Sequence, residues 1–124
     1  MLPSGTHLLL EYTGCHVACL DDPQLLEAAL RQAAEAARAR VVSSAFHRFR
    51  PGGVTGILLL EESHLSIHTW PEHAYAAVDF FTCGAGDPAR ARDILREALG
   101  AVRVEALHVL RGQLGAAATL SVKS

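Results

Sequence analysis

The chain has 124 residues, which is enough for one domain with a single hydrophobic core and too few for two domains. Half of the residues are hydrophobic and 19% are charged, a balance that excludes an intrinsically disordered chain. Eleven basic against thirteen acidic residues give a formal net charge of −2, so the chain lacks the basic excess that binds phosphate backbones. We therefore expect no nucleic-acid partner.

The sequence also predicts that the protein has no membrane partner. Its longest apolar runs, Leu8–Leu10 and residues 56–60, are far shorter than the roughly 20 residues of a membrane span. Residues 1–7 lack the basic start and long apolar stretch of a secretory signal. The cysteines are Cys15, Cys19 and Cys83. An odd number without a CxxC pair suits a reducing compartment, so we expect a cytoplasmic protein.

The first half of the chain predicts a strand and then a helix. Residues 7–12, which include the apolar run Leu8–Leu10, predict a buried strand that ends at a Thr-Gly pair. Asp22 is a good N-cap and is followed by Pro23, and one apolar face then continues to about Arg40. The residues of that face are Leu25, Leu26, Ala29, Leu30, Ala33 and Ala37. Such a face predicts a helix that packs on a sheet.

Four strands are expected next, at residues 41–49, 54–61, 64–70 and 75–83, with turns between them. The third strand alternates between two faces. One face has Leu65, Ile67 and Thr69, and the other has His64, Ser66, His68 and Trp70. The second face of this strand is therefore polar and rich in rings.

A second helix is predicted from Asp87 and Pro88 to Gly100, and a last strand covers residues 102–110. The order β-α-β-β-β-β-α-β predicts an α+β two-layer sandwich, a mostly antiparallel sheet with two helices on one face. The apolar residues left on the other face are Leu59, Ala77 and Phe81. We expect a second copy to cover that face in a four-layer α-β-β-α dimer, unless the sheet curves and partly closes on itself.

Two kinds of chemistry are consistent with the residues between Phe46 and residue 84. His64 and His68 are four apart, but on a strand that spacing is about 13 Å, so no metal site is predicted. Cys83, Ser63 or Ser66 could act as a nucleophile beside a histidine base. No G-x-S-x-G motif supports a catalytic serine, so composition alone favours a buried thiol and surface hydroxyls without a catalytic role.

Three segments carry a resemblance to a known family. They read GVTG at 53–56, ESHLSIHTWPE at 62–72 and YAAVDFFTCG at 75–84, with FHxF at 46–49 upstream. In this order and spacing they closely resemble the prokaryotic S-adenosylmethionine decarboxylase proenzymes. The resemblance extends over about residues 5–111.

The resemblance implies that the single domain of residues 1–124 cuts itself between Glu62 and Ser63, giving a beta chain of residues 1–62 and an alpha chain of residues 63–124. Ser63 would become a pyruvoyl group, the cofactor that forms a Schiff base with the substrate amine and accepts electrons as CO₂ leaves. By the same resemblance, His68 is the base that assists cleavage. Cys83 is the acid that protonates the product carbanion.

The implied reaction is decarboxylation of S-adenosyl-L-methionine to S-adenosylmethioninamine, for spermidine biosynthesis, by a homodimer of alpha/beta pairs. Phe49 and His68 would stack on the adenine, and Glu72 would bind the ribose. Arg50 and Gly52 beside Phe49 differ from the family pattern, so the same pyruvoyl chemistry on arginine or ornithine is an alternative. A further alternative is an unprocessed, inactive homologue that serves as a dimer partner.

Overall fold

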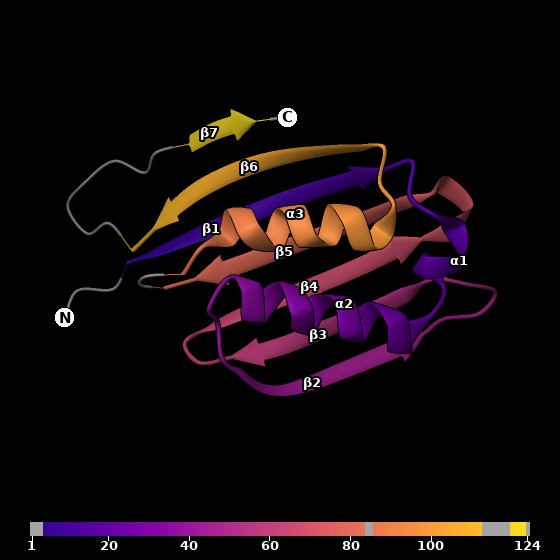
Figure 1. Ribbon diagram of the computed structural model, residues 1–124, viewed down its shortest axis with the longest axis horizontal. Helices are drawn as coiled ribbons and strands as arrows, with labels where there is room; N and C mark the ends of the chain where they lie inside the picture. The colour runs from indigo at the N-terminus through magenta and orange to yellow at the C-terminus, as the bar shows by residue number, and fades with distance from the viewer. Residues whose placement is uncertain (1–3, 84–85, 113–119, 124) are drawn as a thin grey trace.

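A computed structural model describes residues 4–83, 86–112 and 120–123, and these form one antiparallel sheet with helices on one face (Figure 1). The strand order is β2-β3-β4-β5-β1-β6-β7. The strands are β1 (Gly5–Thr13), β2 (Val41–Arg48), β3 (Val54–Leu60), β4 (Ser63–Trp70), β5 (Tyr75–Thr82), β6 (Arg103–Arg111) and β7 (Leu120–Lys123). The helices are α1 (Val17–Leu20), α2 (Pro23–Ala36), α3 (Pro88–Leu99) and the 3₁₀ turn η1 (Pro71–His73).

Helix α2 begins as the sequence predicts but ends earlier. The Asp22 carboxylate accepts hydrogen bonds from the backbone N–H groups of Gln24 and Leu25, at 3.1 and 3.2 Å. The helix stops at Ala36, about four residues before the predicted end, because Arg38 takes a left-handed conformation with φ of 62°. The N–H of Ala39 then bonds to the carbonyl of Ala34, which closes a Schellman motif without the usual glycine.

Helix α3 follows its prediction closely. Asp87 occupies the N-cap position, although its side chain makes no capping hydrogen bond. Gly100 ends the helix with φ of 62°, a conformation that glycine adopts without strain. No helix of the described residues is long and apolar enough to cross a bilayer.

The core lies between the helices and one face of the sheet, so the two-layer prediction is confirmed for this chain. On β4, Leu65, Ile67 and Thr69 are buried as the alternation predicted. Helices α2 and α3 lie side by side over them (Figure 1). The largest helix residues in the core are Leu26, Leu30, Leu95 and Leu99.

Three short elements were absent from the sequence prediction. Helix α1 and the turn η1 have four and three residues, too few to show a helical period. Strand β7 pairs with β6 through Val109 and Leu120, in a tail where no strand was expected. Gly84, the last residue of the YAAVDFFTCG segment, lies outside the described residues.

The second face of the sheet carries no helix among the described residues. Ile57 and Leu59 of β3 are 40% and 50% exposed there, and Ala77 and Phe81 of β5 are half-buried. Trp70 of β4 is 41% exposed. We refer to this helix-free side as the open face.

Candidate active site

Ser63 lies at the first position of β4, directly after a tight turn. Leu60 and Ser63 pair across the β3-β4 hairpin, so only Glu61 and Glu62 form the loop. Glu62 has φ of 59°, a left-handed conformation that costs a non-glycine residue about 1–2 kcal/mol. The Ser63 hydroxyl donates a hydrogen bond to the carbonyl of Glu61, with 3.2 Å between the oxygens. The Glu62-Ser63 peptide is therefore held in a strained turn beside a hydroxyl group.

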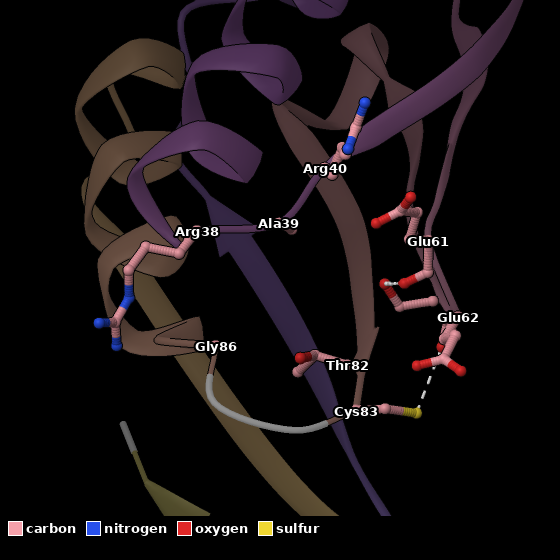
Figure 2. A pocket seen from close by; sticks show the side chains of 9 residues that line it. Arg38, Ala39, Arg40, Glu61, Glu62, Thr82, Cys83 and Gly86 are labelled. Atoms are coloured by element: carbon pink, nitrogen blue, oxygen red, sulfur yellow. Dashed lines mark hydrogen bonds between the residues drawn. The ribbon is translucent and has the colours of Figure 1, made fainter.

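Cys83 lies next to this turn because β5 runs beside β4. His64 pairs with Phe81, which brings the end of β5 to the start of β4. The Cys83 thiol donates a hydrogen bond to the carbonyl oxygen of Glu62, at 3.2 Å, and Figure 2 shows the thiol pointing at the turn. A cavity of about 330 Å³ opens beside these groups. Its lining is Arg38, Ala39, Arg40, Glu61, Glu62, Ser63, Thr82, Cys83 and Gly86.

His68 lies toward the other end of β4, exposed on the open face. Its Nδ1 atom is 3.0 Å from the hydroxyl oxygen of Thr55, which is its direct partner on β3. His68 is five positions after Ser63, and on a strand this spacing is about 16 Å. Within one chain, His68 is therefore too far away to take a proton from Ser63.

The other residues expected to bind substrate lie at the His68 end. Phe49 follows β2 and is 47% exposed, with one edge contact to the ring of His47 at 4.7 Å between centroids. Glu72 is exposed in η1, four residues after His68. The site residues thus fall into two groups at opposite ends of β4, one around Ser63 and one around His68.

The sequence profile of the S-adenosylmethionine decarboxylase family matches residues 6–112, and this range includes both groups. The chain belongs to this family. The proenzyme of Thermotoga petrophila that carries this family's name is 48% identical over 110 residues, which cover 88% of this chain and 85% of that protein. The proenzyme of Anoxybacillus flavithermus is 43% identical over 108 residues, which cover 87% of each chain.

A solved structure of the family agrees with the fold. The crystal structure of the adenosylmethionine decarboxylase from Aquifex aeolicus VF5 superposes with a TM-score of 0.76 at 34% sequence identity. The match covers 90% of this chain and 92% of that chain. The resemblance read from the sequence motifs is therefore confirmed at the level of the family and of the fold.

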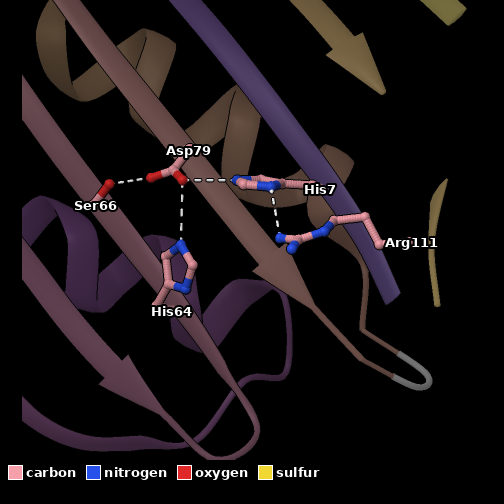
Figure 3. Close-up of polar contacts among 5 residues, drawn as sticks. All are labelled: His7, His64, Ser66, Asp79 and Arg111. Carbon is pink, nitrogen blue, oxygen red and sulfur yellow. Dashed lines mark hydrogen bonds and ion pairs between the residues drawn. The ribbon is translucent and has the colours of Figure 1, made fainter. Parts of the chain in front are cut away.

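This family member also has a polar cluster at the centre of its open face (Figure 3). The Oδ2 atom of Asp79 is 2.7 Å from His7 Nε2 and 3.2 Å from His64 Nε2, and Ser66 donates a hydrogen bond to Oδ1. Arg111 lies 3.4 Å from the Nδ1 atom of His7. Because a guanidinium can only donate, Nδ1 accepts this bond and the proton of neutral His7 is on Nε2, directed at Asp79.

The Asp79 carboxylate is stabilised as an anion by this cluster. Burial raises its pKa, but hydrogen bonds from Ser66, His7 and His64 more than offset burial, and the pKa is lowered overall. The cluster joins β1, β4 and β5 through one carboxylate. The hydroxyl of Ser66, one of the nucleophile candidates, is hydrogen-bonded to Asp79 in this cluster.

A second polar contact joins β5 to β1 farther along the open face. The ring of Tyr75 stacks on Trp70, with 5.2 Å between centroids, and its hydroxyl donates a hydrogen bond to the Glu11 carboxylate. Burial and the bond to Glu11 raise the pKa of Tyr75 to about 12. The neutral phenol is therefore the form that this contact favours.

Thr55 is the site residue that sequence reasoning missed. The resemblance includes its segment, GVTG, but gives it no role. Its contact with His68 depends on the β3-β4 register. The only signal in the sequence was that Thr55 and His68 both belong to strands predicted to be neighbours.

Proposed function

We propose that this protein is a pyruvoyl-dependent S-adenosylmethionine decarboxylase that first cuts its own chain between Glu62 and Ser63. The observation that supports this most directly is the strained Glu62-Ser63 turn, with the thiol of Cys83 on the Glu62 carbonyl. Cleavage gives a beta chain of residues 1–62 and an alpha chain of residues 63–124. The product, S-adenosylmethioninamine, is the aminopropyl donor for spermidine biosynthesis.

The residues at the turn fit the formation of a pyruvoyl group. The Ser63 hydroxyl attacks the carbonyl carbon of Glu62, and the peptide becomes an ester with a free amine on Ser63. Loss of the Ser63 α-proton then expels the Glu62 carboxylate and leaves dehydroalanine, which takes up water and releases ammonia. When present, the pyruvoyl group withdraws electrons from the substrate as CO₂ is lost.

The base for this α-proton comes, in our proposal, from a second copy of the chain. Within one chain His68 is about 16 Å from Ser63 along β4. The open face exposes Ile57 and Leu59, and such an apolar surface is a suitable dimer interface. In a four-layer α-β-β-α dimer of two open faces, we place one copy's His68 beside the other copy's Ser63, which lies at the first position of β4 and is only partly buried. A histidine imidazole is a chemically suitable group for removing this proton.

The same arrangement gives each substrate a site made by two subunits. Phe49 and His68 stack on the adenine and Glu72 binds the ribose hydroxyls, all at one end of β4. The reacting amino-acid end then extends toward Ser63 and Cys83 of the other subunit. There the Cys83 thiol donates the proton that completes the product.

Intact mass and CO₂ release test the function. The purified protein is expected as two fragments with a blocked N-terminus on the second, and Ser63→Ala as one uncut chain near 13.2 kDa. Ser66→Ala is the matched control and should be cut, because Ser66 bonds to Asp79 and not to the turn. CO₂ should come from S-adenosylmethionine and not from arginine or ornithine. Cleavage of Ser63→Ala at this bond would refute self-processing.

Complementation tests the shared site. A tagged Ser63→Ala chain cannot be cut but keeps His68, and a His68→Ala chain keeps Ser63 but lacks the base. Each variant alone should stay whole. When the two are produced together, the His68→Ala chain should be cut inside mixed dimers. If mixed dimers form and this chain stays whole, the base does not come from the partner.

A further inference from the structure

Asp21, at the corner between α1 and α2, holds both sides of the β2-β3 hairpin. Its Oδ2 atom forms an ion pair with Arg48 at 2.6 Å, and its Oδ1 atom accepts a hydrogen bond from the N–H of Gly53 at 2.9 Å. Its backbone carbonyl also accepts a bond from Arg48 Nε, at 3.3 Å. Arg48 precedes the loop of residues 49–52 and Gly53 follows it. The Asp21 side chain therefore forms polar contacts with the residues at both ends of this loop.

The loop carries Phe49, whose ring is exposed. It is 47% exposed and meets the edge of His47. The N–H of Phe49 donates a hydrogen bond to the carbonyl of Gly53 at 2.8 Å. The backbone position of Phe49 therefore depends on Gly53, whose own N–H is bound by Asp21. Gly53 has φ of 104°, and a Cβ atom there would be 2.9 Å from the carbonyl oxygen of Thr69. The β2-β3 hairpin is therefore packed closely between Asp21 and β4.

The corner that carries Asp21 is fixed without its carboxylate. The buried hydroxyl of Thr69 donates to the carbonyl of Leu20 at 2.6 Å and accepts from the N–H of Val54 at 2.8 Å. These bonds join α1, β3 and β4 through backbone groups. Replacing the Asp21 side chain therefore loosens the loop more than the fold.

We infer that Asp21 is a positioning residue for substrate binding, which sets the place of the Phe49 ring against the adenine. The inference rests on the proposed function and extends it to a residue with no contact to the reacting atoms. Ser63 and Cys83 lie at the opposite end of β4. Loss of the Asp21 carboxylate should therefore weaken nucleoside binding and leave self-cleavage and the chemical step unchanged.

Asp21→Asn is the test, because it keeps the shape and one acceptor oxygen but removes the charge that pairs with Arg48. We expect KM for S-adenosylmethionine to rise about tenfold, with kcat and the rate of cleavage within about twofold of wild type. Binding of 5′-methylthioadenosine, which has the nucleoside but no amino-acid group, should weaken by the same factor. Trp70, the single tryptophan, lies 6.4 Å from the ring of His68 and reports this binding by fluorescence.

Glu27→Gln is the matched control. Glu27 of α2 pairs with Arg31 at 2.9 Å and accepts a bond from Ser44 of β2 at 3.0 Å, so it is also a carboxylate linking this side of the chain to β2. It does not touch the 49–52 loop, and KM should not change. Arg48→Gln removes the same ion pair from its other partner, so it should also raise KM for S-adenosylmethionine.

The outcomes separate the inference from the function it rests on. Unchanged KM and nucleoside affinity in both Asp21→Asn and Arg48→Gln, with an active wild type, would overturn the positioning role. An equal fall of kcat, cleavage rate and melting temperature in Asp21→Asn would also overturn it, because that pattern marks a structural role. A wild type that neither binds the nucleoside nor releases CO₂ from S-adenosylmethionine would refute the proposed function instead.

Discussion

The thiol of Cys83 donates a hydrogen bond to the carbonyl oxygen of Glu62, with 3.2 Å between sulfur and oxygen. In the proposed self-cleavage, this carbonyl receives negative charge when the Ser63 hydroxyl attacks it. A donor already aimed at that oxygen stabilises the charge as it develops. We therefore expect the thiol to take part in self-cleavage, as well as in the later proton donation implied by the family.

Cys83→Ala should slow self-cleavage by about tenfold, because the Glu62 carbonyl loses its donor while Ser63 and the turn remain. Cys83→Ser keeps a donor and should cleave closer to the wild-type rate. Both variants should turn over poorly once cleaved, since neither supplies a thiol proton to the product. The time course of fragment formation on a denaturing gel measures the first effect, and CO₂ release measures the second. A wild-type rate of cleavage in Cys83→Ala would show that the thiol acts only in decarboxylation and not in self-cleavage.

Thr55→Val should slow self-cleavage by about tenfold, because His68 loses the partner of its Nδ1 atom and its ring is free to rotate. Valine has nearly the same shape, so packing on the open face is kept. Thr55→Ser retains the hydroxyl and should restore most of the rate. Fragment formation after synthesis is again the measurement. Equal rates in the serine and valine variants would mean that the hydroxyl does not orient the ring.

Local patterns in the sequence predicted the layers of the fold well. The alternation at Leu65 and Ile67 placed β4 correctly because side chains on a strand change face at every residue. The end of α2 was misplaced because Arg38 takes a left-handed position where glycine is the usual signal. Short elements without a full period were not visible at all.

The sequence motifs name the candidate site residues, and the structure adds how these residues are arranged. The motifs around Ser63, His68 and Cys83 follow one another in sequence and imply a single centre. The sequence predicts a strand over residues 64–70, and the length of β4 separates His68 from Ser63 and Cys83. The contact of Thr55 with His68 required the cross-strand register, which one sequence does not specify.

Tyrosine ionisation should be delayed in the folded protein. The chain has two tyrosines, and burial raises the pKa of Tyr12, while burial and Glu11 raise that of Tyr75 to about 12. Phenolate absorbance should therefore stay low through pH 10, where both tyrosines ionise in the unfolded chain. Stability from Tyr75 is complete below about pH 10 and is lost as the pH rises toward 12. Tyr75→Phe should remove the step near pH 12, and the unfolded protein in guanidinium is the control.

Asp79→Asn should destabilise the fold at neutral pH, and the loss should shrink in acid. The folded pKa of Asp79 is lowered, so its contribution is present above the unfolded pKa of about 4 and disappears as the pH falls through the folded pKa. At pH 7 the variant loses charged hydrogen bonds from His7, His64 and Ser66, worth about 1–3 kcal/mol in unfolding free energy.

Urea unfolding of the Ser63→Ala chain, which stays whole, measures the Asp79 effect without the complication of two fragments. Asp93→Asn is the control, because Asp93 is 69% exposed in a pair with Arg92 and its loss should change stability by less than about 1 kcal/mol at any pH. The difference between Asp79→Asn and its parent should be largest near neutrality and fall steadily below pH 4. A difference that stays constant into acid would mean that Asp79 acts through packing, and that the three donors do not stabilise its charge.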